Sequence, residues 1–225
     1  MDPNHLLKAA RQQFLDGEVA AAIQSLERLE ELARTDSALL QQIAGTYLQC
    51  GQNSKADRCY RRAVEVQPNN PDCIYNLATS RVALGDIEEA EGLFTRAIKL
   101  NPQDYGAWLN RSGLKKQTTE SNHVEQLQYI RAHLDEEDAG RVQVCFALAK
   151  ELEDLGRSDE SFQYLQEGAH RRRLGMQYDV AEDEQAMAAV SRAFGPDLFQ
   201  GKPAGHSSNR PVFILGLPRL SLIHI

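Results

Sequence analysis

The sequence repeats itself at a fixed interval of 34 residues. Two sets of small residues keep this spacing: Gly17, Gly51 and Gly85, and Ala22, Ala56 and Ala90. Pro68 and Pro102 are separated by the same interval. Such agreement predicts one structural unit repeated in tandem, so the chain is expected to fold by stacking neighbouring units rather than around a single centre.

Each unit contains two segments with helical periodicity. In residues 71–102, apolar residues recur at intervals of three and four: Ile74, Leu77, Ala78 and Val82 in the first segment, and Ala90, Phe94, Ala97 and Ile98 in the second. Gly85 separates the segments and favours the left-handed conformation that closes a helix. Asn70 followed by Pro71 is typical of a helix start, and Pro102 ends the second helix. The pattern predicts two helices joined by a tight turn.

A 34-residue helix-turn-helix with this pattern resembles the tetratricopeptide repeat. Three units span residues 3–36, 37–70 and 71–104, a degenerate unit spans 105–134, and a degenerate repeat-like helix pair spans 140–175. The resemblance implies an all-α fold, a tetratricopeptide-repeat α-solenoid in which helix pairs form a right-handed superhelix, here followed by a short C-terminal strand. In the fourth unit Thr118, Thr119 and Glu120 occupy the place of the turn glycine, so we expect a longer helix or an irregular turn before residue 123.

Composition excludes several classes of function. The net charge of -7 argues against a nucleic-acid partner, because affinity for phosphates requires an excess of Lys and Arg. The longest apolar run is far shorter than the roughly 20 residues that span a membrane, and the first residues lack a secretory signal, so we expect a cytoplasmic chain without a membrane partner. The four cysteines form no Cys-x-x-Cys pair, so we expect buried core residues and no metal site. Residues 1–200 contain no recognisable catalytic motif, and no catalytic residue is assigned.

The candidate binding residues occupy the sixth position of successive units. Gln42, Asn76 and Asn110 are spaced by 34 residues. They resemble the asparagine ladder of other tetratricopeptide superhelices, which implies that the groove binds a protein or peptide partner through amides that both donate and accept hydrogen bonds. A plain solvated groove is the alternative. Gln41, Gly45 and Gly106 stand where a carboxylate clamp would need Lys and Asn, so a chaperone adaptor is not expected.

The basic run of residues 170–173 has two interpretations. The first is the last turn of a helix, where cations complement the helix dipole, and the second is an anion contact.

The C-terminal residues differ from the repeats in composition and pattern. Residues 176–209 predict a connector helix near 180–194 and a Gly- and Pro-rich linker. Residues 211–217 then form a short apolar run that predicts a buried strand. It leads into Pro218 and Arg219, at a Gly/Pro turn with a cation, and such turns begin many phosphate-binding loops.

The segment RPVFILGLPR (210–219) resembles the opening of the sulfotransferase domain in bacterial tetratricopeptide repeat-containing sulfotransferases. That resemblance implies that Pro218 and Arg219 contact the donor 3′-phosphoadenosine 5′-phosphosulfate (PAPS) in the full-length family member. Leu220, Ser221 and Leu222 replace the expected Ser-Gly-Thr. We therefore expect residues 210–225 to be the truncated start of that domain, and the present chain to lack the catalytic core, bind no donor and be inactive.

Two functional hypotheses follow. The first is the repeat scaffold and protein-interaction region of a PAPS-dependent sulfotransferase. The second is a stand-alone tetratricopeptide-repeat adaptor that binds peptide or protein partners through its concave groove.

Overall fold

The computed structural model describes residues 3–194, whose regular structure consists of eleven helices. They are α1 (Pro3–Leu15), α2 (Val19–Leu32), α3 (Ser37–Gln49), α4 (Asn53–Val66), α5 (Pro71–Leu84), α6 (Ile87–Leu100), α7 (Tyr105–Gly113), α8 (Val124–His133), α9 (Gly140–Asp154), α10 (Ser158–Leu174) and α11 (Val180–Ala193). The chain divides into two compact units, the first ending at Met176 and the second beginning at Gln177. The predicted all-α fold is confirmed for the described residues, and the strand predicted at 211–217 lies outside them.

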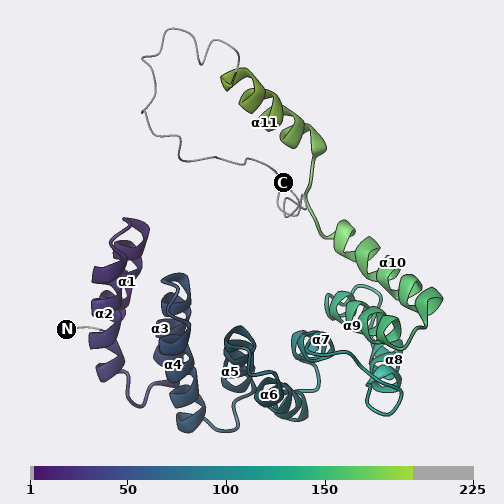
Figure 1. Cartoon of the computed structure of the whole chain (residues 1–225), viewed down its shortest axis with the longest axis horizontal. Helices are drawn as coiled ribbons and strands as arrows, with labels where there is room; N and C mark the ends of the chain where they lie inside the picture. The colour runs from purple at the N-terminus through teal and green to yellow at the C-terminus, as the bar shows by residue number, and fades with distance from the viewer. Residues whose placement is uncertain (1–2, 195–225) are drawn as a thin grey trace, which may run out of the picture. The chain divides into compact units, whose positions relative to one another are not determined.

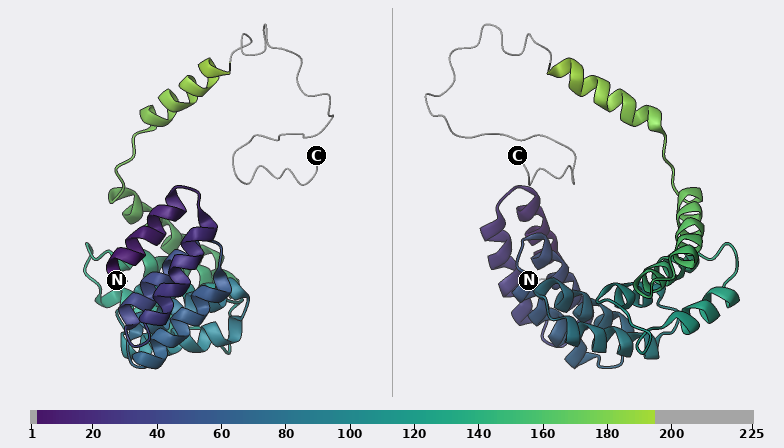
Figure 2. Two further views of the ribbon diagram at one scale, coloured as in Figure 1. Left: turned by 90° about the vertical axis from the view of Figure 1, so that its left-hand side faces the viewer. Right: turned by 45° about the vertical axis from the view of Figure 1, so that its right-hand side comes forward.

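The helices of the first unit pack in chain order. α1 packs on α2, α3 on α4, α5 on α6 and α9 on α10, and the pairs are linked by contacts of α2 with α3, α4 with α5, α6 with α7 and α7 with α9. Figure 1 and Figure 2 show these pairs side by side as successive layers. This sequential stacking is the solenoid architecture that the repeat predicts.

Local sequence sets the helix ends as predicted. Gly51 and Gly85 adopt φ of 71° and 83°, a left-handed conformation that other residues rarely tolerate. The side chain of Asp36 accepts a hydrogen bond from the backbone N–H of Leu39 at 3.0 Å, and Asn70 caps α5 in the same way. α4 and α6 end shortly before Pro68 and Pro102.

The interior consists of two clusters of apolar side chains. One includes Leu26, Leu40 and Tyr47 from the first two pairs, and the other includes Phe94 and Leu148 from the later helices. The alanines at the helix crossings are fully buried: Ala22, Ala56, Ala63, Ala90 and Ala97. All four cysteines are free and buried, as predicted.

The fourth unit departs from a simple pair. α7 ends at Gly113 after nine residues, and α7 and α8 both pack against α9. Between them the backbone N–H of Gln117 donates to Asp154 Oδ2 at 2.8 Å, and that of His123 donates to a Glu151 carboxylate oxygen. Of the two alternatives predicted here the irregular segment is found, and two carboxylates of α9 hold it in place.

The basic run lies in the last turn of α10, which agrees with the helix-dipole interpretation. Arg171 also pairs with Glu136 and Glu167. In the second unit, α11 occupies the predicted connector region, with the Asp179 side chain accepting from the backbone N–H of Ala181. Within residues 3–194, no helix is both long enough and apolar enough to cross a membrane.

Candidate functional site

The first helices of successive pairs are joined by side-chain hydrogen bonds at one regular interval. Arg11 on α1 donates to Thr46 on α3 at 3.4 Å. Asn76 on α5 donates to Gln41 on α3 at 2.6 Å, and Asn110 on α7 donates to Tyr75 on α5 at 2.8 Å. Each bond joins residues 35 positions apart. We call the face formed by α1, α3, α5 and α7 the groove.

The three amides predicted to line the groove do not play equal parts. Asn76 and Asn110 are half-buried, and each uses one N–H of its amide for a bond to the preceding first helix. Their amide oxygens accept no hydrogen bond from the described residues and stay available to a ligand. Gln42 has no such bond, because the residue 35 positions before it is the apolar Leu7. Its side chain is exposed instead.

The first open hollow of the groove lies between α1 and α3 and measures about 420 Å³. We call it the N-terminal hollow, and its lining residues are Arg11, Phe14, Leu15, Gln42, Gly45, Thr46 and Gln49. A Cβ atom added at Gly45 would meet no neighbouring atom within 4 Å, so the glycine itself helps to create the space. The lining combines apolar side chains, neutral polar groups and one cation, with no carboxylate.

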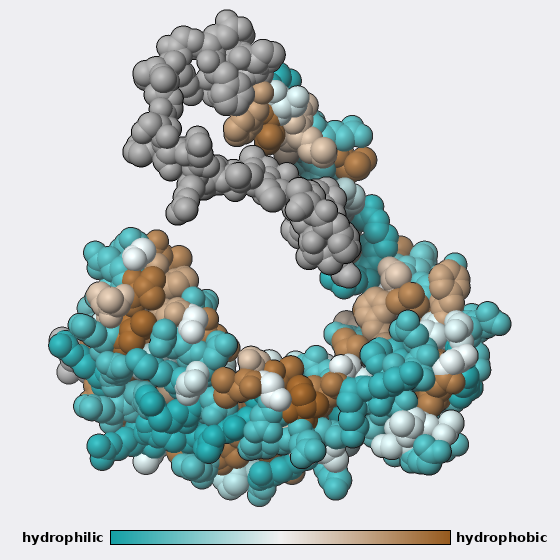
Figure 3. All heavy atoms as spheres, viewed as in Figure 1, coloured by the Kyte–Doolittle hydropathy of each residue, from teal (hydrophilic) through white to brown (hydrophobic). Residues whose placement is uncertain are grey.

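The second open hollow lies among α5, α6 and α7 and measures about 290 Å³. We call it the middle hollow, and its lining residues are Thr79, Val82, Ile87, Phe94, Asn110, Gly113 and Leu114. Again a glycine, Gly113, has open space where a side chain would be. Figure 3 shows apolar residues gathered over this part of the first unit. The middle hollow has no charged lining and is suited to an apolar side chain.

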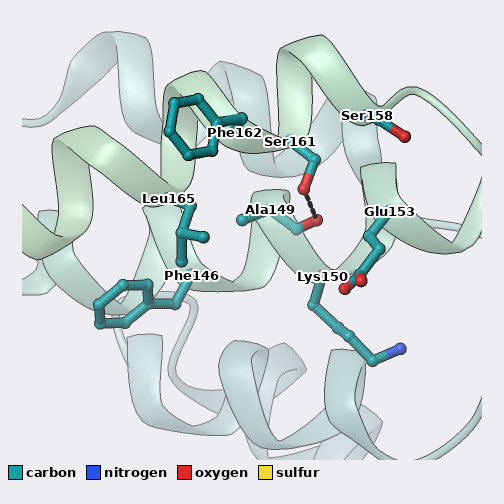
Figure 4. Close-up of a pocket in the computed structure, with 8 residues that line it drawn as sticks. All are labelled: Phe146, Ala149, Lys150, Glu153, Ser158, Ser161, Phe162 and Leu165. Carbon is teal, nitrogen blue, oxygen red and sulfur yellow. Dashed lines mark hydrogen bonds between the residues drawn. The ribbon is translucent and has the colours of Figure 1, made fainter.

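A third hollow lies on the last helix pair, between α9 and α10. Figure 4 shows Phe146, Phe162 and Leu165 on one side of it and Lys150 and Glu153 on the other. Ser161 Oγ donates to the backbone oxygen of Ala149 at 2.7 Å. This hollow belongs to a single pair and is separate from the groove.

Paired charges gather on the second helices rather than in the groove. Glu30 on α2 accepts hydrogen bonds from Arg58 and Arg62 on α4, and Tyr47 Oη also donates to it. Burial by itself would raise the pKa of Glu30, but these two arginines bring it below its ordinary value. The carboxylates here are already neutralised by neighbours, so this surface is a structural ion-pair network.

A buried polar cluster beneath α7 and α8 was missed by sequence reasoning. Glu151 is fully buried, and its carboxylate accepts from Ser112 Oγ at 2.5 Å and lies 3.1 Å from His123 Nδ1. Arg111 is also buried, with its guanidinium 4.5 Å from the Trp108 ring centre. The partners of Glu151 are 28 and 39 residues away in sequence, so no local motif predicts the cluster.

The described residues offer little nucleophilic or metal-binding chemistry. Burial raises the pKa of the Cys59 thiol to about 12 and that of Cys145 to about 11, so both thiols stay protonated at neutral pH. Within residues 3–194 no group of three or more His, Cys, Asp or Glu side chains is placed to hold a metal ion. Pro218 and Arg219, predicted to contact the sulfuryl donor, lie outside the described residues.

Known proteins share this repeat and this fold. Two tetratricopeptide-repeat family models match residues 37–70 and 59–92. The photosystem I assembly protein Ycf3 of Synechococcus sp. (strain CC9605) is 31% identical over 124 residues, which cover 48% of this chain and 70% of the relative. An uncharacterized protein of Aquifex aeolicus is 28% identical over 160 residues, covering 71% of this chain and 21% of that protein.

Solved structures show the same architecture. The crystal structure of MamA superposes with a TM-score of 0.56 at 14% identity, covering 75% of this chain and 97% of MamA. A tetratricopeptide repeat protein from Parabacteroides merdae gives a TM-score of 0.56 at 16% identity, covering 76% and 67% of the two chains. Fold and groove together define a solenoid scaffold built from paired helices. The chain belongs to the tetratricopeptide-repeat family.

Proposed function

We propose that this chain is a protein-interaction scaffold that binds an extended peptide segment of a partner protein along the groove. The observation that carries the proposal is the row of available amide oxygens on Asn76 and Asn110, flanked by two open hollows. Amide oxygens accept hydrogen bonds from a peptide backbone, and hollows receive its side chains. The name of the Ycf3 relatives, photosystem I assembly proteins, agrees with a role in handling other proteins.

The test uses an immobilised library of random 12-residue peptides as the probe for the purified full chain. We expect enriched peptides to bind a variant carrying both Asn76→Ala and Asn110→Ala about tenfold more weakly, because each substitution removes one hydrogen-bond partner. Asn53→Ala is the matched control, since Asn53 is exposed at the start of α4. Unfolding midpoints of both variants show whether the stack is intact. A library without enriched peptides, or enriched peptides that bind a folded double variant as well as the parent, would overturn the proposal.

We also propose a finer version of this function, in which the scaffold is the repeat region of a PAPS-dependent sulfotransferase. Its support is the sequence RPVFILGLPR, which includes Pro218 and Arg219. A coding sequence that continues from Arg219 into Ser-Gly-Thr would support it, and turnover of labelled donor by the present chain would contradict the expected inactivity. The stand-alone adaptor hypothesis would be contradicted if the chain bound PAPS and the substitution Arg219→Ala abolished that binding.

A further inference from the structure

The N-terminal end of the groove carries two cations that form no ion pair with the described residues, although Arg11 donates a hydrogen bond to Thr46. Lys8 and Arg11 are exposed, lie one helical turn apart on α1, and form no ion pair with any described carboxylate. Lys8 is 34 residues before Gln42, so it occupies the same repeat position on the groove face. Arg58 on α4 and Arg81 on α5 differ from these two cations, because both pair with carboxylates.

This local positive charge is unusual for an acidic chain. The protein has 32 Asp and Glu residues against 25 Lys and Arg, yet no acid within residues 3–194 lines either groove hollow. A positively charged site free of carboxylates attracts negative side chains and disfavours positive ones. The N-terminal hollow therefore fits an acidic side chain.

The middle hollow supplies the opposite preference. Val82 and Leu114 border it, Phe94 is fully buried at its base, and no charge lines it. A Leu-sized side chain placed there is removed from water, which favours binding. Its burial leaves no polar group unpaired, because the Asn110 amide can form a hydrogen bond with the ligand backbone.

We propose that the occupant of the groove is a peptide segment with an acidic side chain in the N-terminal hollow and a Leu-sized apolar side chain in the middle hollow. This inference rests on the proposed peptide-binding function. The distance from the N-terminal hollow to the middle hollow equals two intervals between the axes of neighbouring first helices, and each interval is about 10 Å. An extended chain covers roughly 20 Å in about six residues, which sets the spacing of the two anchors.

The probes are fluorescent 10-residue peptides with Glu and Leu six positions apart in either order. All are acetylated and amidated, so binding cannot come from a terminal carboxylate. One companion peptide has Lys in place of Glu and another has Ser in place of Leu. By fluorescence anisotropy we expect the Glu/Leu peptide to bind about tenfold more tightly than either companion.

Two variants assign the anchors to the hollows. Arg11→Glu should reverse the preference between the Glu and Lys peptides, whereas Arg28→Glu on α2, also exposed, should not. Gly113→Leu fills the middle hollow and should abolish the advantage of Leu over Ser while leaving the charge preference unchanged. Gly92→Leu is its control, because Gly92 is an exposed helical glycine on α6 that also has open space around it.

The outcomes separate this inference from the proposed function. Equal binding of the Glu and Lys peptides, or of the Leu and Ser peptides, overturns the inference even when library peptides bind in the groove. Binding of neither these probes nor any library peptide overturns both. Variants whose unfolding midpoints match the parent but whose preferences do not change also overturn the assignment to the hollows.

Discussion

At the scale of single residues, the buried carboxylate of Glu151 holds the irregular segment that takes the place of the usual turn between α7 and α8. It accepts hydrogen bonds from the backbone N–H of His123 and from the hydroxyl of Ser112. Burial by itself raises the pKa of Glu151, but the hydrogen bonds from His123 and Ser112 bring it below its ordinary value. Burial lowers the pKa of Arg111, while the charge of Glu151 acts in the opposite direction.

We predict that Glu151→Gln lowers the free energy of unfolding at pH 7 by about 2 kcal/mol, because the hydrogen bonds from His123 and Ser112 lose their charged acceptor and Arg111 keeps only the opposing charge of Glu91. Since the folded-state pKa of Glu151 lies below 4.5, its contribution is present above that pH and is lost as the pH falls through the folded-state value. Urea unfolding at pH 7 and pH 3 should therefore show a smaller acid-induced loss for the variant than for the parent. Glu153→Gln, an exposed position on the same helix, is the control. Equal losses for the two variants at pH 7 would contradict the prediction.

At the scale of single elements, capping distinguishes α3, the first helix of its unit, from α2, the second helix of the preceding unit. The Asp36 side chain caps α3, whereas Glu18, in the equivalent place before α2, makes no capping hydrogen bond. An N-cap side chain satisfies a backbone N–H that the helix cannot satisfy itself. The two helices therefore depend differently on the residue that precedes them.

Asp36→Ala should lower the free energy of unfolding by about 1 kcal/mol, because the Leu39 N–H loses its acceptor. Glu18→Ala should leave it nearly unchanged. Both values come from urea unfolding followed by circular dichroism at neutral pH. If the two substitutions lower the free energy of unfolding by the same amount, the interpretation of Asp36 as a cap is wrong.

The same contrast explains what the sequence could and could not predict. Helix ends at Asn70 and Gly85 depend on neighbouring residues, so local patterns located them correctly. The groove bonds of Asn76 and Asn110 join residues 35 positions apart, and a comparison at that offset would have found their partners. The Glu151 cluster follows no repeat interval, and only tertiary packing brings its members together.

At the scale of the whole molecule, the described core has two clusters that meet within α5. Leu77 belongs to the first cluster and Ala78 to the second. The partly buried Leu93 on α6 packs against both clusters, so damage to one cluster reaches the other through α5 and α6. Stability is therefore expected to be local rather than shared equally.

Leu26→Ala should reduce stability by about 2 to 5 kcal/mol and lower amide hydrogen-exchange protection in α1 to α4 more than in α9 and α10. Leu148→Ala should give the opposite distribution. Both leucines are fully buried, which makes the pair a matched comparison. Exchange measured by mass spectrometry after peptic digestion resolves the two regions, and a uniform loss of protection in either variant would rule out a modular core.

Gly45 and Gly113 line the proposed binding surface without contributing to the buried core. Each lies within a first helix, lines a groove hollow and has open space where a side chain would be. Single substitutions at these two positions can therefore reshape what the groove accepts without disturbing the buried seams. We expect point mutations at these positions to change the specificity of the proposed peptide site, one hollow at a time.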